Sequence, residues 1–294
     1  MRTIIALLSL CYSVIAIADR PLPDTTPLAS DEPVVDTPIT EDLSPSQTAT
    51  ALTAPPANAP TPIVEQAPAA TPKPFEATYR AKISGARGEA VMRLAPLDSG
   101  RFIFHSDTRA RGVARLFRSD PIIECSVFHA ATSDGWQAQT YRYRDGRKDS
   151  DIDFDTDGER IATRYRNESS TLAWRADTTD RLLEQLIVSR AVVDGDEPGE
   201  RRVVDRGSLQ TIVWTRLANE TIDVGAGRFE TVKYRRSRTG SKRSSLIWFA
   251  PSLDGVPVRI EQFRLEDRQA VATLERYADA ATLQARGTVT PVCP

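Results

Sequence analysis

Histidine and cysteine are scarce in this chain, whose 294 residues include two histidines and three cysteines. His105 and His129 stand apart, and no Cys-x-x-Cys or His-x-x-x-His pair occurs, so the ligand spacing of a zinc site is missing. No glycine-rich phosphate loop follows a predicted strand, and no Gly-x-Ser-x-Gly turn precedes a predicted helix. The sequence therefore predicts neither a catalytic residue nor a cofactor.

Long apolar runs are also lacking, with one exception at the start of the chain. Arg2 precedes an apolar stretch from Thr3 to Ile15, and the small residues of Ala16-Ile17-Ala18 follow it. This order is typical of a signal peptide over residues 1–18, cleaved between Ala18 and Asp19, and it predicts a periplasmic protein. The alternative is an uncleaved inner-membrane anchor, although the run falls short of the ~20 residues that span a bilayer comfortably.

Aromatic residues are absent from residues 19–74, which hold thirteen of the twenty prolines in the chain. Eight acidic residues in this segment face only Arg20 and Lys73. Such a composition cannot bury enough apolar surface to offset the entropy of ordering, so a disordered, proline-rich acidic linker is expected. It would serve as a spacer if the N-terminal segment stayed in the membrane.

Residues 75–280 read as a single β-rich domain, followed by a C-terminal tail of residues 281–294. Apolar and polar residues alternate with the period of a half-buried strand, and Asp-Gly and Ser-Gly turns separate the segments. One exception, Thr179–Val193, has the apolar stripe of an amphipathic helix, with Thr179 or Asp180 as its cap and Gly195 as its stop. The predicted fold is mainly β: a curved antiparallel sheet or open barrel with one inserted amphipathic helix. Strands are expected at 75–83, 88–94, 101–106, 122–130, 136–144, 152–154, 160–165, 202–206, 209–217, 220–224, 229–237, 245–249, 256–265 and 270–277.

Six short patterns carry a resemblance to a known family. They are Phe75-Glu76-Ala77-Thr78-Tyr79, Ile123-Glu124-Cys125-Ser126-Val127-Phe128, Tyr141-Arg142-Tyr143-Arg144-Asp145-Gly146, Asp180-Arg181-Leu182-Leu183, Gly227-Arg228-Phe229-Glu230-Thr231-Val232, and the stretch from Trp248-Phe249-Ala250-Pro251 to Pro257-Val258-Arg259-Ile260-Glu261. Together they resemble the exported proteobacterial domain of unknown function 3108 family, over most of Phe75–Tyr277. The last pattern is also similar to that of periplasmic lipoprotein carriers, which implies a curved sheet around an apolar cavity. Neither resemblance supplies an activity.

Asp153, Asp155 and Asp157 alternate ahead of Gly158, like the first half of a calcium-binding loop. The twelfth position of such a loop should be a glutamate and is Arg164, and no helices flank the motif. An acidic hairpin tip is the favoured interpretation, with calcium binding as the weaker alternative.

Two predicted hairpins are rich in basic residues. The first carries Arg142, Arg144, Arg147 and Lys148; the second carries Lys233, Arg235, Arg236, Arg238, Lys242 and Arg243. Clustered cations bind anionic lipid or other anionic envelope components, with Arg235, Arg236 and Arg238 as the candidate residues. Nucleic acid is not expected as a partner in the periplasm. The favoured alternative is that these arginines keep the strands soluble.

On a helical wheel Arg190 falls within the apolar stripe of the predicted helix. A guanidinium in that position must pair with a carboxylate or extend to solvent. Glu124 is the favoured partner in a buried ion pair, with Glu261 as a second candidate and extension to solvent as an equal alternative.

Removal of the signal peptide would leave two cysteines, Cys125 and Cys293, in an oxidising compartment. We predict a disulfide between them that fixes the C-terminal tail across the sheet. The alternative is two separate thiols, one buried and one reactive.

Taken together, these patterns favour a non-enzymatic periplasmic binding or envelope-associated protein that holds an apolar or amphipathic ligand. A membrane-tethered structural or partner-binding domain on a proline-rich spacer is the alternative. A hydrolase with a scattered Ser-His-Asp arrangement comes third. The sequence predicts no oligomeric state.

Overall fold

The computed structural model describes residues 71–132, 135–287 and 289–294, and these form a β-rich unit. The predicted signal peptide, its cleavage site at Ala18 and Asp19, and most of the proline-rich segment lie outside the described residues. Among the helices that are described, none has the length and apolar character needed to span a bilayer.

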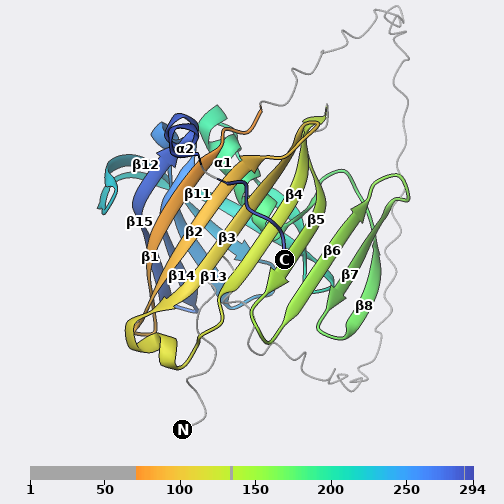
Figure 1. The fold of residues 1–294 in the computed structure, drawn as a ribbon, viewed down its shortest axis with the longest axis horizontal. Coiled ribbons are helices and arrows are strands. Elements are labelled where there is room, and N and C mark those ends of the chain that lie inside the picture. Colours follow the sequence, from red (N-terminus) through yellow and green to blue (C-terminus); the bar gives the residue numbers. More distant parts are fainter. Residues whose placement is uncertain (1–70, 133–134, 288) are drawn as a thin grey trace, which may run out of the picture. The chain divides into compact units, whose positions relative to one another are not determined.

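Fifteen strands form one continuous sheet in the described part of the chain (Figure 1). They are β1 (Phe75–Ile83), β2 (Ala86–Pro96), β3 (Arg101–Arg111), β4 (Ile122–Thr132), β5 (Gly135–Arg144), β6 (Asp149–Asp155), β7 (Arg160–Tyr165), β8 (Glu168–Ala173), β9 (Thr178–Asp180), β10 (Glu200–Asp205), β11 (Ser208–Val224), β12 (Gly227–Arg238), β13 (Arg243–Ala250), β14 (Val256–Arg264) and β15 (Asp267–Asp279). Three helical segments join strands of this sheet, η2 (Gly112–Leu116), α1 (Arg181–Asp194) and η3 (Pro251–Leu253), and a further helix, α2 (Ala280–Arg286), follows β15.

The sheet is an open meander whose two halves meet at β1 and β15. Its order runs from β8 down to β1, continues with β15, and descends to β9. Neighbouring strands are antiparallel, except for β9 and β10, which are parallel. The predicted mainly β fold, a curved antiparallel sheet with an inserted helix, is confirmed.

Alternating burial explains why these segments form strands. In β1, Phe75, Ala77, Tyr79, Ala81 and Ile83 are buried, as the sequence pattern predicts. Two strands were not predicted: β8 is polar and largely exposed, and β9 has three residues, so neither shows a usable alternation. The predicted strands at 209–217 and 220–224 are one strand, β11, interrupted by an irregularity between Arg216 and Asn219.

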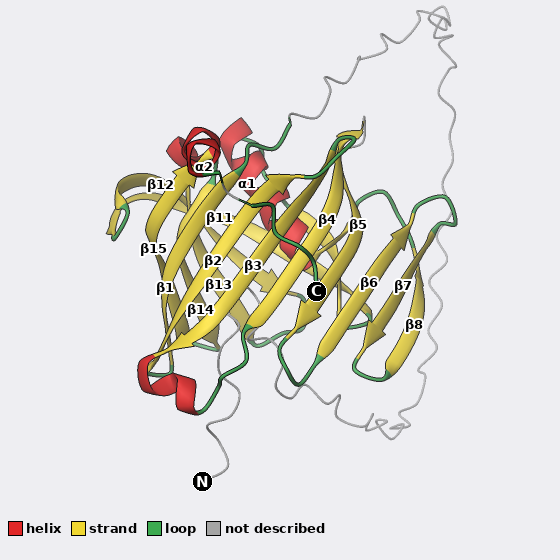
Figure 2. Ribbon diagram, viewed as in Figure 1, coloured by secondary structure: helices red, strands yellow, loops and turns green. Residues whose placement is uncertain are grey.

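Helix α1 lies against the concave face of the sheet, behind β2–β5 in the view of Figure 2. Asp180 caps it and Gly195 ends it in a left-handed conformation, as predicted. The predicted amphipathic stripe is wrong for the first two turns, where Arg181, Glu184 and Gln185 are buried together with the leucines. Because the curved sheet surrounds this part of the helix, polar as well as apolar positions lose contact with water.

The C-terminal tail runs over the outer face of the sheet and ends at β4 (Figure 1). Cys125 and Cys293 form a disulfide with their Cα atoms 5.6 Å apart, which confirms the predicted pairing. Since successive residues of a strand point to opposite faces, Cys125 faces outward while Glu124 and Ser126 contact the helix side.

Candidate functional site

The first turn of α1 is fixed to the sheet by a buried ion pair. Arg181 Nη2 lies 2.7 Å from Glu124 Oε2, and both side chains are almost fully buried. The hydroxyl of Tyr141 donates to Glu124 Oε2 over 3.0 Å, and Arg181 Nε donates to the same hydroxyl oxygen over 2.7 Å. The guanidinium also lies over the ring of Tyr143, 5.1 Å from its centre. Burial raises the pKa of the Tyr141 phenol well above its ordinary value, so that it stays a neutral donor.

A second buried ion pair follows three residues later, on the other half of the sheet. Arg236 Nη2 of β12 lies 2.7 Å from Glu184 Oε2, and the indole nitrogen of Trp214 donates to Glu184 Oε1 over 2.8 Å. The two ion pairs therefore connect α1 to strands β4 and β12, which lie far apart in the sheet order.

Asp180 is a third buried carboxylate at this end of α1. Together with the ion pairs Arg181–Glu124 and Arg236–Glu184 it forms a buried polar cluster. Asp180 Oδ1 accepts hydrogen bonds from the backbone N–H groups of Leu182 and Leu183 at 2.8 and 2.9 Å, and its Oδ2 accepts one from Ser126 Oγ at 2.7 Å. Burial raises the pKa of this carboxyl to about 6, against the opposing effect of these hydrogen bonds. Because the contacts are internal and well paired, the cluster acts as an anchor for α1 and presents no activated nucleophile.

The other end of α1 has a different character. Among the described contacts, no side-chain hydrogen bond or ion pair connects residues 186–194 to the sheet. Gly255, in the turn after η3, allows that turn to approach the helix closely, because a Cβ there would lie 2.3 Å from the backbone oxygen of Ser189. The C-terminal half of α1 is thus held by packing.

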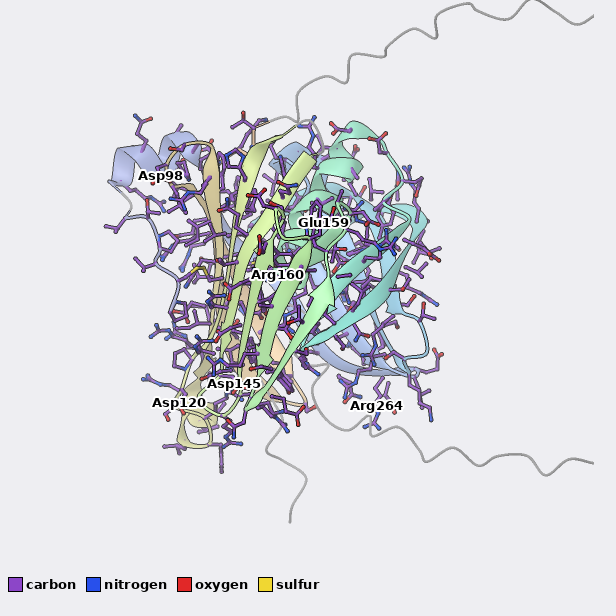
Figure 3. All side chains as sticks on the ribbon, turned by 90° about the vertical axis from the view of Figure 1, so that its right-hand side faces the viewer. Asp98, Asp120, Asp145, Glu159, Arg160 and Arg264 are labelled. Atoms are coloured by element: carbon purple, nitrogen blue, oxygen red, sulfur yellow. A yellow bond between two sulfur atoms is a disulfide. The ribbon has the colours of Figure 1, made fainter. Side chains whose placement is uncertain are left out.

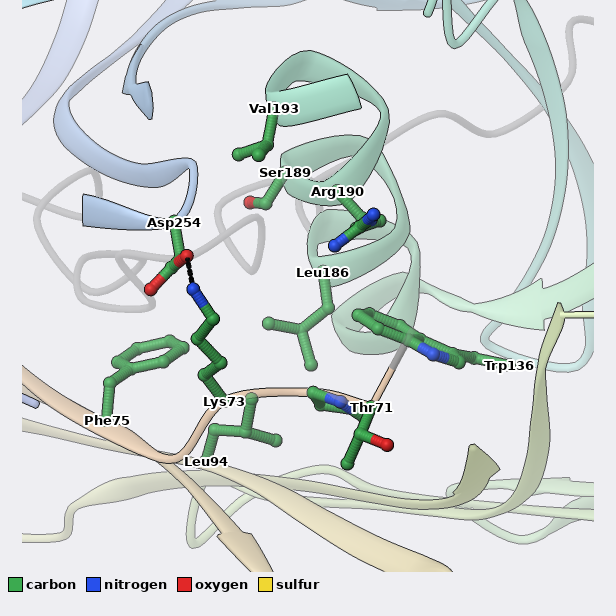
Figure 4. A pocket seen from close by; sticks show the side chains of 11 residues that line it. Thr71, Lys73, Phe75, Leu94, Trp136, Leu186, Ser189, Arg190, Val193 and Asp254 are labelled. Atoms are coloured by element: carbon green, nitrogen blue, oxygen red, sulfur yellow. Dashed lines mark hydrogen bonds and ion pairs between the residues drawn. The ribbon is translucent and has the colours of Figure 1, made fainter. Parts of the chain in front are cut away.

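A small cleft of about 50 Å³ opens beside this half of the helix (Figure 4). Its lining is mostly apolar and comes from the segment before β1, strands β1, β2 and β5, helix α1 and the turn after η3. Lys73 Nζ donates to Asp254 Oδ1 over 2.5 Å across the mouth. The apolar side chains that line it include Phe75, Leu94, Trp136, Leu186 and Val193.

The predicted buried pair between Arg190 and Glu124 is wrong. Arg190 forms an ion pair with Asp194 one turn along the helix and reaches solvent, and Glu124 binds Arg181 instead. Arg181 and Arg190 are nine residues apart, which places them on opposite sides of a helix with 3.6 residues per turn. The second candidate, Glu261, is bound to Arg259 and Arg268.

The three candidate anion-binding arginines do not form one surface. Arg236 lies inside, bound to Glu184, whereas Arg235 is exposed on the outer face, since adjacent strand residues point in opposite directions. Arg238 donates to Gln210 Oε1 over 3.3 Å.

The candidate calcium ligands are likewise separated. Asp153 is bound to Arg142 at 2.6 Å and Asp155 to Arg160 at 2.8 Å, while Asp157 lies exposed in the β6–β7 turn. Asp155 also accepts a hydrogen bond from the backbone N–H of Gly158 at 2.9 Å, so it stabilises the turn. Across the residues described, no group of three potential ligands is arranged to hold a metal ion.

Sequence reasoning missed Arg181, Glu184 and Arg236 as partners in the polar cluster. The available signal was the Asp180-Arg181-Leu182-Leu183-Glu184 stretch, in which two opposite charges flank a leucine pair on a short predicted helix. A helix enclosed by a sheet needs a buried partner of opposite charge for Arg181 and another for Glu184. Glu124 can pair only with Arg181, so a buried cation was needed for Glu184 as well.

The protein family model for proteins of unknown function DUF3108 matches residues 75–274. The chain belongs to this family. The match begins at the first residue of β1 and ends within β15, so the DUF3108 region contains the buried ion pairs and strands that line the cleft. The resemblance predicted from the short patterns is therefore confirmed.

Solved structures offer more distant similarities to the DUF3108 chain. A β-barrel-like protein of domain of unknown function DUF1849 from Brucella abortus has 10% identity and a TM-score of 0.45, covering 70% of this chain and 98% of its own. A protein described as exported, with a YmcC-like fold, from Bacteroides fragilis has 12% identity and a TM-score of 0.34, with coverages of 71% and 97%. A protein described as a lipoprotein from Parabacteroides distasonis has 11% identity and a TM-score of 0.30, with coverages of 71% and 96%. The comparison with curated proteins gives no match.

Proposed function

We propose that this DUF3108 protein is a non-enzymatic periplasmic binding protein that holds an apolar segment of a lipid-like ligand between the C-terminal half of α1 and the sheet. The observation that carries the proposal is the unequal attachment of α1. Its first turns are fixed by two buried ion pairs, whereas its last turns rest on apolar packing beside an apolar cleft.

The present cleft, at about 50 Å³, has room for no more than a few water molecules. Pockets for small organic ligands measure about 300–1,000 Å³, so ligand entry requires the last turns of α1 to move away from β1 and β2. Lys73 and Asp254 form an exposed ion pair at the mouth, and such a pair opens at little cost. The signal peptide predicted at the start of the chain supports the periplasmic location.

A fluorescent fatty acid titrated into the purified protein tests this proposal. We expect saturable binding that quenches Trp136, which lines the cleft, and loss of that quenching in Trp136→Phe. Val193 lines the cleft and is 37% exposed, so Val193→Trp should block entry and weaken binding by a factor of about ten.

Leu209→Trp is the matched control, because Leu209 is 44% exposed and lies outside the cleft. It should bind the probe like the parent. The proposal fails if no saturable binding is found, or if Val193→Trp and Leu209→Trp bind equally well. Native mass spectrometry of the protein isolated from cells would then identify any ligand retained from the envelope.

A further inference from the structure

Three large apolar side chains are exposed together in the loop between β3 and β4. Val113, Leu116 and Phe117 expose 78%, 84% and 78% of their surface. Their spacing places them side by side around the short η2 turn. Ala114, the buried residue of this turn, packs toward the interior. Among the described residues, the other large apolar side chains that are more than half exposed are Val289 and Val292 in the C-terminal tail and Leu265 in the β14–β15 turn. Contiguous exposed apolar groups of this kind mark surfaces that contact a protein or a membrane.

The same end of the sheet is positively charged. Alternate turns of an antiparallel meander lie at one end, and Figure 3 shows Asp120, Asp145 and Arg264 at the end opposite to Asp98 and Glu159. We call the end with Asp120 the basic rim and define it by the turns at 84–85, 112–121, 145–148, 166–167, 206–207, 239–242 and 265–266. These turns contain seven basic residues (Arg115, Arg118, Arg147, Lys148, Arg166, Arg206 and Lys242) and three acidic ones (Asp120, Asp145 and Glu266).

The opposite end has the reverse composition. Its described turns, at 97–100, 156–159, 174–177, 195–199, 225–226 and 251–255, contain seven acidic residues and one basic residue, Arg175. The two ends of the sheet therefore differ strongly in charge, although the chain as a whole has a formal net charge of −2. Such a distribution orients a protein in front of a charged surface.

Several of the cations on the basic rim lie close enough to act on one another. The pKa of Lys148 is lowered, first by burial and then by the positive charges of Arg166, Arg206 and Arg118, with Asp145 opposing them. Cations held near each other in this way repel one another, and an anion such as a phosphate that binds between them relieves this repulsion.

We propose that the basic rim docks on the surface of an anionic phospholipid bilayer. Val113, Leu116 and Phe117 enter the interface between headgroups and acyl chains, and the surrounding cations contact lipid phosphates. The charge of the rim complements anionic lipid, and three adjacent side chains are too small a contact for a stable protein interface, which buries about 800 Å² on each partner. The acidic end, with the cleft and Asp254, faces away from the membrane.

Vesicle sedimentation tests the docking surface with the purified protein. We expect the parent to sediment with vesicles of phosphatidylcholine and phosphatidylglycerol, to bind vesicles of phosphatidylcholine alone much less, and to be released by salt. The variant Val113→Ser/Leu116→Ser/Phe117→Ser should bind anionic vesicles at least about tenfold less, because it removes the apolar contact. Arg115→Glu/Arg147→Glu, which changes two exposed cations of the rim, should bind less and lose most of its salt dependence.

Val289→Ser/Val292→Ser is the matched control, since these valines are 82% and 81% exposed and lie in the tail. It should bind like the parent. Thermal melting confirms that each variant is folded, which is expected because the changed side chains are exposed. The proposal is overturned if the parent fails to bind anionic vesicles at low salt, or if the triple serine variant binds like the parent. It is also overturned if the parent is a dimer in sedimentation velocity and the triple serine variant is a monomer. Because the fatty acid titration probes the other end of the sheet, either proposal can fail while the other stands.

Discussion

Arg181 is the residue on which the attachment of the first turn of α1 depends most. Its removal would leave the buried Glu124 without a cation, and an unpaired charge in the interior is costly. We expect Arg181→Leu to lower the free energy of unfolding by about 3–5 kcal/mol, measured by urea denaturation.

Arg190→Leu, on the same helix, provides the control for this change. Its guanidinium is exposed and bound to Asp194 one turn away, so the loss should be within about 0.5 kcal/mol. A combined Arg181→Leu/Glu124→Leu variant should recover much of the stability, because it removes both charges. Equal stability of Arg181→Leu and the parent would contradict the assigned pair.

Asp180 makes the stability of the fold depend on pH. Its pKa is raised to about 6 in the folded state, above the value near 4 of an unfolded aspartate. Between these values the folded state holds a proton that the unfolded state has lost, so the contribution of Asp180 to stability is complete below about pH 4 and is lost as the pH rises to about 6. The difference amounts to about 3 kcal/mol.

Asp180→Asn separates this charge effect from the capping role of the side chain. Asparagine also caps helices and carries no charge, so the variant should match the parent at pH 4 and be more stable at pH 7. Asp180→Ala, which loses the cap, should be less stable than Asp180→Asn by about 1 kcal/mol at both values. Denaturation curves at the two pH values measure the free energy of unfolding of each variant. If the difference between Asp180→Asn and the parent is the same at both pH values, the raised pKa is contradicted.

At the scale of elements, the C-terminal tail depends on its disulfide. Val289 and Val292 are largely exposed, so packing contributes little to the position of the tail. The bridge joins residues 168 positions apart, and the chain-entropy model assigns a loop of that length about 5 kcal/mol as an upper value.

We expect Cys125→Ala/Cys293→Ala to lose a few kcal/mol of stability in chemical denaturation, up to that value. Alkylation of the denatured, unreduced protein should label neither cysteine, and labelling should appear after reduction. Modification of both thiols in unreduced monomer would contradict the bridge.

The individual elements show which structural features could be predicted from sequence patterns and which could not. Strand β1 was predictable because every second side chain faces the core, and the cysteine pair because cleavage of the predicted signal peptide would leave two thiols. Helix α1 was located correctly, including Asp180 and Gly195. Its contacts were not predictable, because a helical wheel assumes one buried side, whereas the sheet covers the first turns on all sides and so buries Arg181 and Glu184. The exposed edge strand β8 depends on pairing with β7 and has no pattern of its own.

At the scale of the whole described unit, the two ends of the sheet have separate chemistry. One end carries the cleft, the attachment point of the N-terminal segment and most of the acidic turns; the other carries the basic rim with Val113, Leu116 and Phe117. Since strands alternate in direction, residues distant in the sequence gather at each end without any need for sequence repeats. Because the turns that form the basic rim are scattered along the sequence, the two basic hairpins predicted from it could not be recognised as parts of one surface.

The position of β1 beside β15 also has a consequence for the speed of folding. Every other neighbouring pair in the sheet joins strands that follow each other in the sequence, while this pair brings Phe75 next to Asp279. Closing so long a loop has an entropic cost that the hairpins avoid, and folding slows as contacts become more distant in the sequence. The two halves, β1–β8 and β9–β15, can therefore form early and independently, with the pairing of β1 and β15 as the late step that brings both sides of the sheet around α1.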